Sequence, residues 1–190
     1  MALLVTVAAF TALEVLAFSG ISHAWHHVTF GQLLEQQRVW PSRARSVVLV
    51  GTISLELLLG LGGLFVLVNG FGTLRLAQTI FAASTVLFLA YLAFAAYLIR
   101  WRPGAPCACG STHEVVNSWT VARAGMLAAA ALAASIAPAA AYAPPRPGMY
   151  GFITVVGSLS LAVILWALPG ALEDPTRWLA NQHARSMEAT

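Results

Sequence analysis

Five apolar stretches dominate the chain, each about as long as a helix that crosses a membrane. A bilayer core is spanned by about 20 predominantly apolar residues in helical conformation. The stretches cover roughly residues 2–24, 46–68, 76–98, 119–141 and 150–168, separated by segments rich in proline, glycine and arginine. The pattern predicts an all-α fold: a polytopic membrane helical bundle with about five transmembrane helices, four in a core and one peripheral.

The composition excludes several other classes of protein. Hydrophobic residues make up 59% of the 190 residues and charged residues only 9%, whereas a soluble domain carries about 25% charged residues. So few charges cannot cover the surface of a soluble enzyme, a nucleic-acid-binding domain or a disordered chain. We therefore expect membrane lipid around the protein and no nucleic acid partner.

The stretches are expected to form one domain over residues 1–170, followed by a short polar tail at 171–190. No basic residue precedes the first stretch, and its apolar run is longer than that of a signal peptide, so we predict a retained helix. Gly60, Gly62 and Gly63 in the second stretch and the alanines of the fourth are typical of helices that approach closely in lipid.

The distribution of arginine predicts the orientation in a plasma membrane. With five spans, one side of the membrane carries seven arginines: Arg38, Arg43, Arg45, Arg100, Arg102, Arg177 and Arg185. The other side carries two, Arg75 and Arg146. Since positive charge concentrates in cytoplasmic loops, this count predicts an outside N-terminus and a cytoplasmic loop at 99–118.

That loop holds both cysteines of the chain, Cys107 and Cys109. Pro106 and Gly110 flank them and favour a turn that brings the two sulfurs within bonding reach. A ring this small is strained and therefore easily reduced, which suits a redox couple better than a structural disulfide. The alternative interpretation is a pair of unlinked buried cysteines that pack as small hydrophobic residues.

The neighbours of the cysteines favour the reactive form. Arg100 and Arg102 supply positive charge that stabilises a thiolate. Ser111 and Glu114 have the spacing of a capping box, which predicts a helix that starts just after the cysteines.

Three histidines end the first stretch: His23, His26 and His27. Spacings of three and four residues place them near one helical face, on the same side of the membrane as the loop at 99–118. Together with Cys107, Cys109 and His113 they form a candidate zinc or copper site. The alternative is that they are interfacial histidines bonded to headgroups and loops.

Two acids fall inside the apolar stretches, at similar predicted depths: Glu14 and Glu56. A carboxylate is costly to place in lipid, so each is a candidate functional residue for proton handling. The alternative role is a neutral carboxyl that holds helices together through hydrogen bonds. Arg123, near the start of the fourth stretch, is a candidate partner for an acid.

The cysteine turn, followed by Trp119 and Arg123 at the entry to an apolar helix, resembles the MauE family of methylamine-utilisation membrane proteins, which is similar to DoxX-like proteins. Glu56 resembles the acid usual in the second helix of that family. The sequence departs from the family pattern in lacking a phenylalanine after Cys109 and in having Ala124 in place of asparagine.

The resemblance implies a redox-associated role: thiol–disulfide exchange, or maturation of a partner protein, together with a thioredoxin-like protein. In this hypothesis Cys107 and Cys109 cycle, Arg100 and Arg102 favour thiolate, and Glu56 and Arg123 assist. Two alternatives stay open: a protein that handles copper or zinc, and a non-catalytic assembly subunit that packs against a partner's helices. The cofactor is open between none, a quinone and, in the metal hypothesis, copper or zinc; no motif identifies a quinone site.

Overall fold

The computed structural model describes residues 2–69, 74–106, 115–137 and 149–171. Its helices are α1 (Ala2–Trp25), α2 (His27–Gln36), α3 (Ser42–Asn69), α4 (Leu74–Trp101), α5 (Ser118–Ser135) and α6 (Met149–Ala171). Within these ranges the only β pairing is an isolated bridge between Pro106 and Val115. The prediction of an all-α fold is confirmed.

Three of these helices, α1, α3 and α4, are long and apolar enough to cross a membrane. In α6 the segment Gly151–Leu165 is a shorter apolar helix. Long apolar helices packed side by side define a helical membrane bundle, as the apolar stretches predicted.

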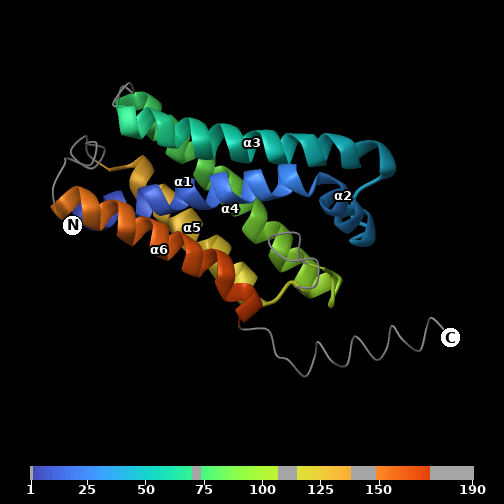
Figure 1. Ribbon diagram of the computed structural model, residues 1–190. Helices are drawn as coiled ribbons and strands as arrows, with labels where there is room; N and C mark the ends of the chain where they lie inside the picture. The colour runs from blue at the N-terminus through green and yellow to red at the C-terminus, as the bar shows by residue number, and fades with distance from the viewer. Residues whose placement is uncertain (1, 70–73, 107–114, 138–148, 172–190) are drawn as a thin grey trace.

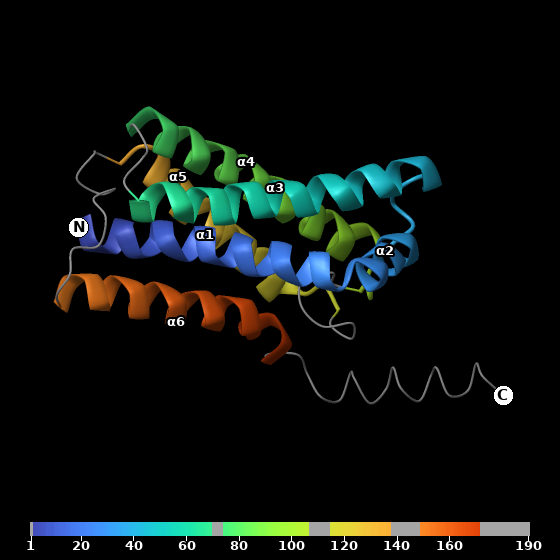
Figure 2. The same cartoon turned by 45° about the horizontal axis from the view of Figure 1, so that its top comes forward.

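Helix α1 is the centre of the bundle. In both ribbon views it lies between α3 and α6 (Figures 1 and 2), and its most extensive contacts are with α3, α6 and α5. Helix α4 packs mainly on α5 and touches α3 only lightly. Residues on all sides of α1 are therefore buried, among them Phe10, Leu13 and Leu16.

Close packing of α1 on α3 depends on small residues. A Cβ atom at Gly60 would overlap the backbone nitrogen of Ala17 and lie 2.8 Å from its Cα. A Cβ at Gly63 would come within 2.9 Å of the Leu13 side chain, whereas one at Gly62 would meet nothing within 4 Å. Of the three glycines singled out in the second stretch, Gly60 therefore lets the two helix backbones touch, and Gly63 makes room for the Leu13 side chain.

The structure corrects the end of the fourth apolar stretch. We expected a helix through residue 141, but α5 ends at Ser135 and Ile136 is its C-cap. Pro138 explains the difference, because a proline disfavours helical backbone in the residue before it. Residues 138–141 lie outside the described part of the chain.

Helix α5 starts at Ser118, one residue before the expected start of the fourth apolar stretch. Asn117 caps the helix: its side chain accepts hydrogen bonds from the backbone N–H groups of Trp119 and Thr120, and Thr120 completes the capping box. Residues 115–117 are not helical. The prediction of a helix that starts just after the cysteines rests on Ser111 and Glu114, which lie outside the described residues.

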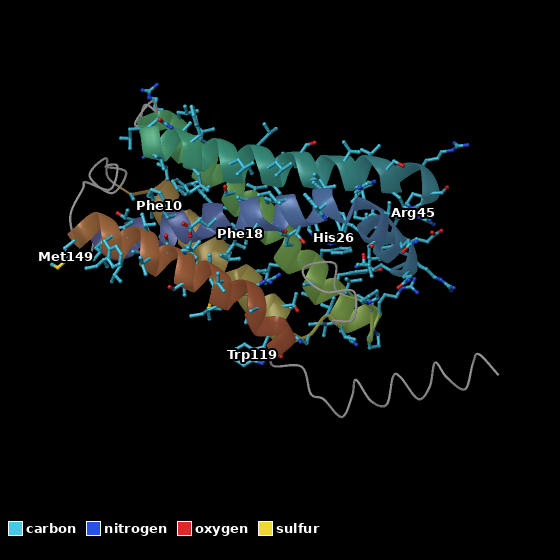
Figure 3. All side chains as sticks on the ribbon, in the orientation of Figure 1. Phe10, Phe18, His26, Arg45, Trp119 and Met149 are labelled. Carbon is cyan, nitrogen blue, oxygen red and sulfur yellow. The ribbon has the colours of Figure 1, made fainter. Side chains whose placement is uncertain are left out.

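Helix α2 was not predicted, because its segment is polar overall and short. Its apolar residues Phe30, Leu33 and Leu34 nevertheless recur at helical spacing and are buried against the bundle. Figure 3 shows His26, at the junction of α1 and α2, and Arg45, near the start of α3, toward one end of the molecule, with Met149 at the opposite end. Helix α2 therefore covers the end of the bundle that carries most of the arginines in the described residues.

Candidate functional site

Glu56 is the polar centre of the bundle. Its side chain is completely buried in the middle of α3. The Ser19 hydroxyl donates to its Oε1 at 2.8 Å, the Tyr91 hydroxyl donates to the same oxygen at 2.9 Å, and His23 Nδ1 lies 2.7 Å from Oε2. One carboxylate thus joins α1, α3 and α4 inside a membrane bundle.

Two features of α1 bring it onto Glu56. Ser19 and His23 are four residues apart, so they lie one above the other on the same face of the helix. Gly20 sits between them, and a Cβ there would lie 3.0 Å from Cβ of Glu56. A larger residue at position 20 would push the helix away from the carboxylate.

Helix α2 fixes the His23 ring from the other side. The ring stacks on Phe30 with centroids 4.2 Å apart and planes 6° from parallel. With Glu56 ionised, Nδ1 of His23 carries the hydrogen of their bond, and the imidazole can gain or release a proton at its other nitrogen. A histidine oriented by a carboxylate is the arrangement used for general acid–base chemistry.

Beside this cluster lies a cavity of about 600 Å³. Its walls are mostly apolar side chains of α1, α3 and α4, closed by α2 and α5. The polar and charged side chains on the wall are Ser19, His23, Gln37, Thr52, Glu56, Tyr91, Thr120 and Arg123.

Arg123 places a permanent positive charge on the wall that also carries Glu56. It is 9% exposed although it stands in an apolar helix. With His23 neutral, the charges of Arg123 and Glu56 sum to zero, which reduces the cost of burying both. The sequence singled out this acid and this arginine as candidates, and the structure brings both to one cavity.

Gln37 connects the cavity to the cysteine segment. Its Nε2 donates to the carbonyl oxygen of Pro106 at 3.0 Å, and Pro106 directly precedes Cys107. The bridge between Pro106 and Val115, and the bond from Val116 N to Ala105 O at 3.0 Å, join the two ends of that segment. Cys107, Cys109 and His113 themselves lie outside the described residues.

The three histidines do not share one helical face. Helix α1 ends at Trp25, so His26 and His27 belong to the turn and to the next helix. Both are exposed and bond to backbone carbonyls, His26 to Ser22 and His27 to Ala24, while His23 is buried on Glu56. Across the described ranges, no three histidine, cysteine or acidic side chains converge in a way that would hold a metal ion.

The two arginines before the cysteines are exposed at the end of α4. The Arg100 guanidinium lies 5.2 Å from the centre of the Trp101 ring. Neither Arg100 nor Arg102 is among the residues that line the cavity. Their positive charge interacts favourably with the negative, C-terminal end of the α4 dipole.

Glu14 belongs to a different contact, between α1 and α6. The Ser158 hydroxyl donates to its Oε1 at 3.0 Å. Its other oxygen is buried and has no hydrogen-bond partner among the described residues. The two intramembrane acids therefore bridge different helices: Glu56 joins α1, α3 and α4, and Glu14 joins α1 to α6.

Sequence reasoning missed Ser19, Tyr91 and Gln37. Ser19 was detectable, because it precedes His23 by one helical turn. Tyr91 has no distinctive spacing in its helix and Gln37 follows a helix that was not predicted, so neither carried a signal.

A helical membrane bundle with a buried carboxylate–histidine cluster beside an apolar cavity is the class of protein that fold and site define. The family model described as Methylamine utilisation protein MauE matches residues 1–137, and the chain belongs to this family. The match spans α1 to α5, with the whole cavity wall, and ends before α6. This confirms the resemblance seen in the sequence and places the protein among membrane proteins of methylamine utilisation. Comparison with curated proteins and with solved structures gave no match.

Proposed function

We propose that this protein carries out thiol–disulfide exchange with a partner protein, with Cys107 and Cys109 as the reacting pair. The observation that supports this most directly is the bond from Gln37 to the Pro106 carbonyl. It ties the residue before Cys107 to the wall of the cavity that holds His23 and Glu56. Exchange proceeds through a thiolate, so a group that can take up the proton of the thiol supports it.

The exchange is balanced between two sulfur pairs. One thiol gives up its proton, and its sulfur attacks the disulfide of a thioredoxin-like partner to form a mixed disulfide. The second thiolate then displaces the partner's sulfur, so that one pair is oxidised as the other is reduced. The reverse sequence oxidises the partner. His23, held by Glu56, is a group in the bundle that can accept and return the proton.

All five long helices cross the plasma membrane in this proposal. Helix α2 and the end of α4 then lie at one face, with Arg38, Arg43, Arg45, Arg100 and Arg102. Arg75, at the start of α4, lies at the other. The excess of arginine makes the first face cytoplasmic, so the thiols exchange with a cytoplasmic partner.

Replacing either cysteine with serine is expected to abolish exchange, because a single thiol cannot complete the disulfide. Thiols are trapped with acid in growing cells, alkylated and counted by mass. The natural chain should show a Cys107–Cys109 disulfide population that shifts with added reductant. One of the two single-serine variants should accumulate a mixed disulfide with the partner, identified by mass spectrometry after purification.

The matched control is Ala108→Ser, which adds a hydroxyl at the same turn and keeps both thiols. Its redox behaviour should equal that of the natural chain. Two thiols that stay reduced in oxidising and reducing growth alike would contradict the proposal. Bound metal that is lost on mutating Cys109 and His26 would favour metal handling. Full function of both serine variants, with a stable co-purifying partner, would favour an assembly subunit.

A further inference from the structure

The size and lining of the cavity fit a small organic molecule. Ligand sites in proteins usually have volumes of about 300–1,000 Å³ and are largely apolar, with a few polar groups that orient the ligand. This cavity holds about 600 Å³, and its polar side chains are few against a mostly hydrophobic wall. Such a site selects a hydrophobic molecule with a small polar head.

The cavity opens sideways, toward lipid. Val47 and Leu55 of α3 both line it, and they are 72% and 48% exposed on the outer surface of the bundle. Helix α3 packs on α1 and makes few contacts with α4. A molecule dissolved in the bilayer can therefore enter between α3 and α4 without passing through water.

The inner wall suits a flat ring. Phe30, Trp40, Tyr91 and Phe94 contribute aromatic side chains from α2, α4 and the segment that joins α2 to α3. Trp40 and Phe94 lie with ring centroids 6.2 Å apart. Aromatic walls favour planar ligands, because stacked and edge-on ring contacts add to the free energy of burial.

Two polar groups on the wall suit two kinds of ligand group, a carbonyl oxygen and a hydroxyl. The Arg123 guanidinium presents several N–H donors, which suit a carbonyl oxygen. Gln37 is 3% exposed and lines the cavity, and its Oε1 is buried with no donor among the described residues. A buried acceptor of this kind calls for a hydroxyl donor.

We propose that this cavity binds a lipid-soluble quinone and its hydroquinone, with the ring between the aromatic side chains and the tail leaving between α3 and α4. The ring oxygens face Arg123 and Gln37. The choice of a quinone over another lipid rests on the proposed function in the direction that oxidises the partner, because the dithiol formed on this chain must then pass on two electrons. The reaction balances as dithiol plus quinone giving disulfide plus hydroquinone, in which both electrons and both protons move to the quinone.

Gly51 allows a direct test, because it lines the cavity and has open space around it. A Cβ at Gly51 would meet nothing within 4 Å, and the same is true of Gly62 on the same helix, which does not line the cavity. Phenylalanine at position 51 fills the site, while phenylalanine at position 62 is the matched control. Both changes are made in a chain that carries Cys107→Ser and Cys109→Ser, so that binding is measured without thiol chemistry.

The measurement is equilibrium binding of a radiolabelled decyl-substituted benzoquinone to the purified protein in detergent. We expect saturable binding that weakens at least about tenfold in Gly51→Phe and stays unchanged in Gly62→Phe. Thermal unfolding identifies any loss of fold, and Gly51→Leu, with a smaller blocking side chain, should then give the same ranking. Absence of saturable binding, or equal affinity in the two phenylalanine variants, would overturn the proposal. So would equal displacement by decylbenzene, which marks a site for alkyl chains only.

Gln37→Leu tests the hydrogen bond to the ligand separately from the space that the ligand occupies. Removing the acceptor should weaken binding of the hydroquinone more than binding of the quinone, so the ratio of the two affinities changes. An unchanged ratio would contradict the assignment of Gln37. Two results separate this proposal from the proposed function. Saturable quinone binding in the double-serine chain, together with thiols of the natural chain that never cycle in cells, would retain the quinone site and reject thiol exchange. Thiols that cycle in cells, together with no saturable quinone binding, would retain thiol exchange and reject the quinone site.

Discussion

Replacing Glu56 with leucine is expected to lower the free energy of unfolding by about 3–5 kcal/mol, because it leaves buried donors without their acceptor. The Ser19 and Tyr91 hydroxyls and the His23 ring all bond to this carboxylate. Chemical or thermal unfolding in detergent measures the loss.

Two further variants separate charge from hydrogen bonding. Glu56→Gln keeps an oxygen that accepts from Ser19 and Tyr91, so it should cost much less stability than leucine while removing the proton-handling pair with His23. Glu35→Gln is the surface control. The carboxylate of Glu35 is 65% exposed beside Arg45, and its loss should cost less than about 1 kcal/mol. Equal stability of Glu56→Leu and the natural chain would show that the cluster does not hold the helices together.

Among substitutions that add a single methyl group, Gly60→Ala is expected to lower the stability of the bundle most. The added Cβ would overlap the backbone of Ala17 and lie 2.9 Å from the carbonyl carbon of Leu16. Backbone cannot rotate out of the way as a side chain can, so α1 and α3 must separate. We expect a loss of about 3 kcal/mol, at the upper end of the usual cost of overpacking.

Gly62→Ala tests the same chemistry on the same helix without the contact. Its Cβ would meet nothing within 4 Å, so its unfolding temperature should match that of the natural chain or exceed it, since alanine favours helix over glycine. Thermal unfolding of the two variants side by side makes the comparison. A small effect at both positions would show that α1 and α3 are not in direct backbone contact.

The apolar stretches predicted the long helices well, because crossing a bilayer requires a length that can be counted. An error arose where short-range chemistry decides: Pro138 follows the end of α5, which stops at Ser135 and not at residue 141. Helix α2 was missed since only three of its ten residues are buried, and the apolar run is too short to stand out.

Glu56 could be singled out from the sequence because an acid in lipid demands a reason. Its partners on other helices could not, because hydrogen bonds between helices depend on how each helix is rotated and how closely the axes approach. The histidines illustrate the limit. Helical spacing assigned His23, His26 and His27 to one face, but α1 ends at Trp25 and only His23 turns inward.

The contact between Glu14 and Ser158 has a consequence for biosynthesis. Proteins are made from the N-terminus, so α1 enters the membrane long before residue 158 has been translated. Until then the acid at position 14 has no Ser158 hydroxyl to receive a bond from, and the surface of α1 that α6 later covers faces lipid or the insertion machinery. Arrival of α6 completes the assembly by covering the last polar face of the first helix, so chains truncated before α6 should be preferred substrates for membrane proteases.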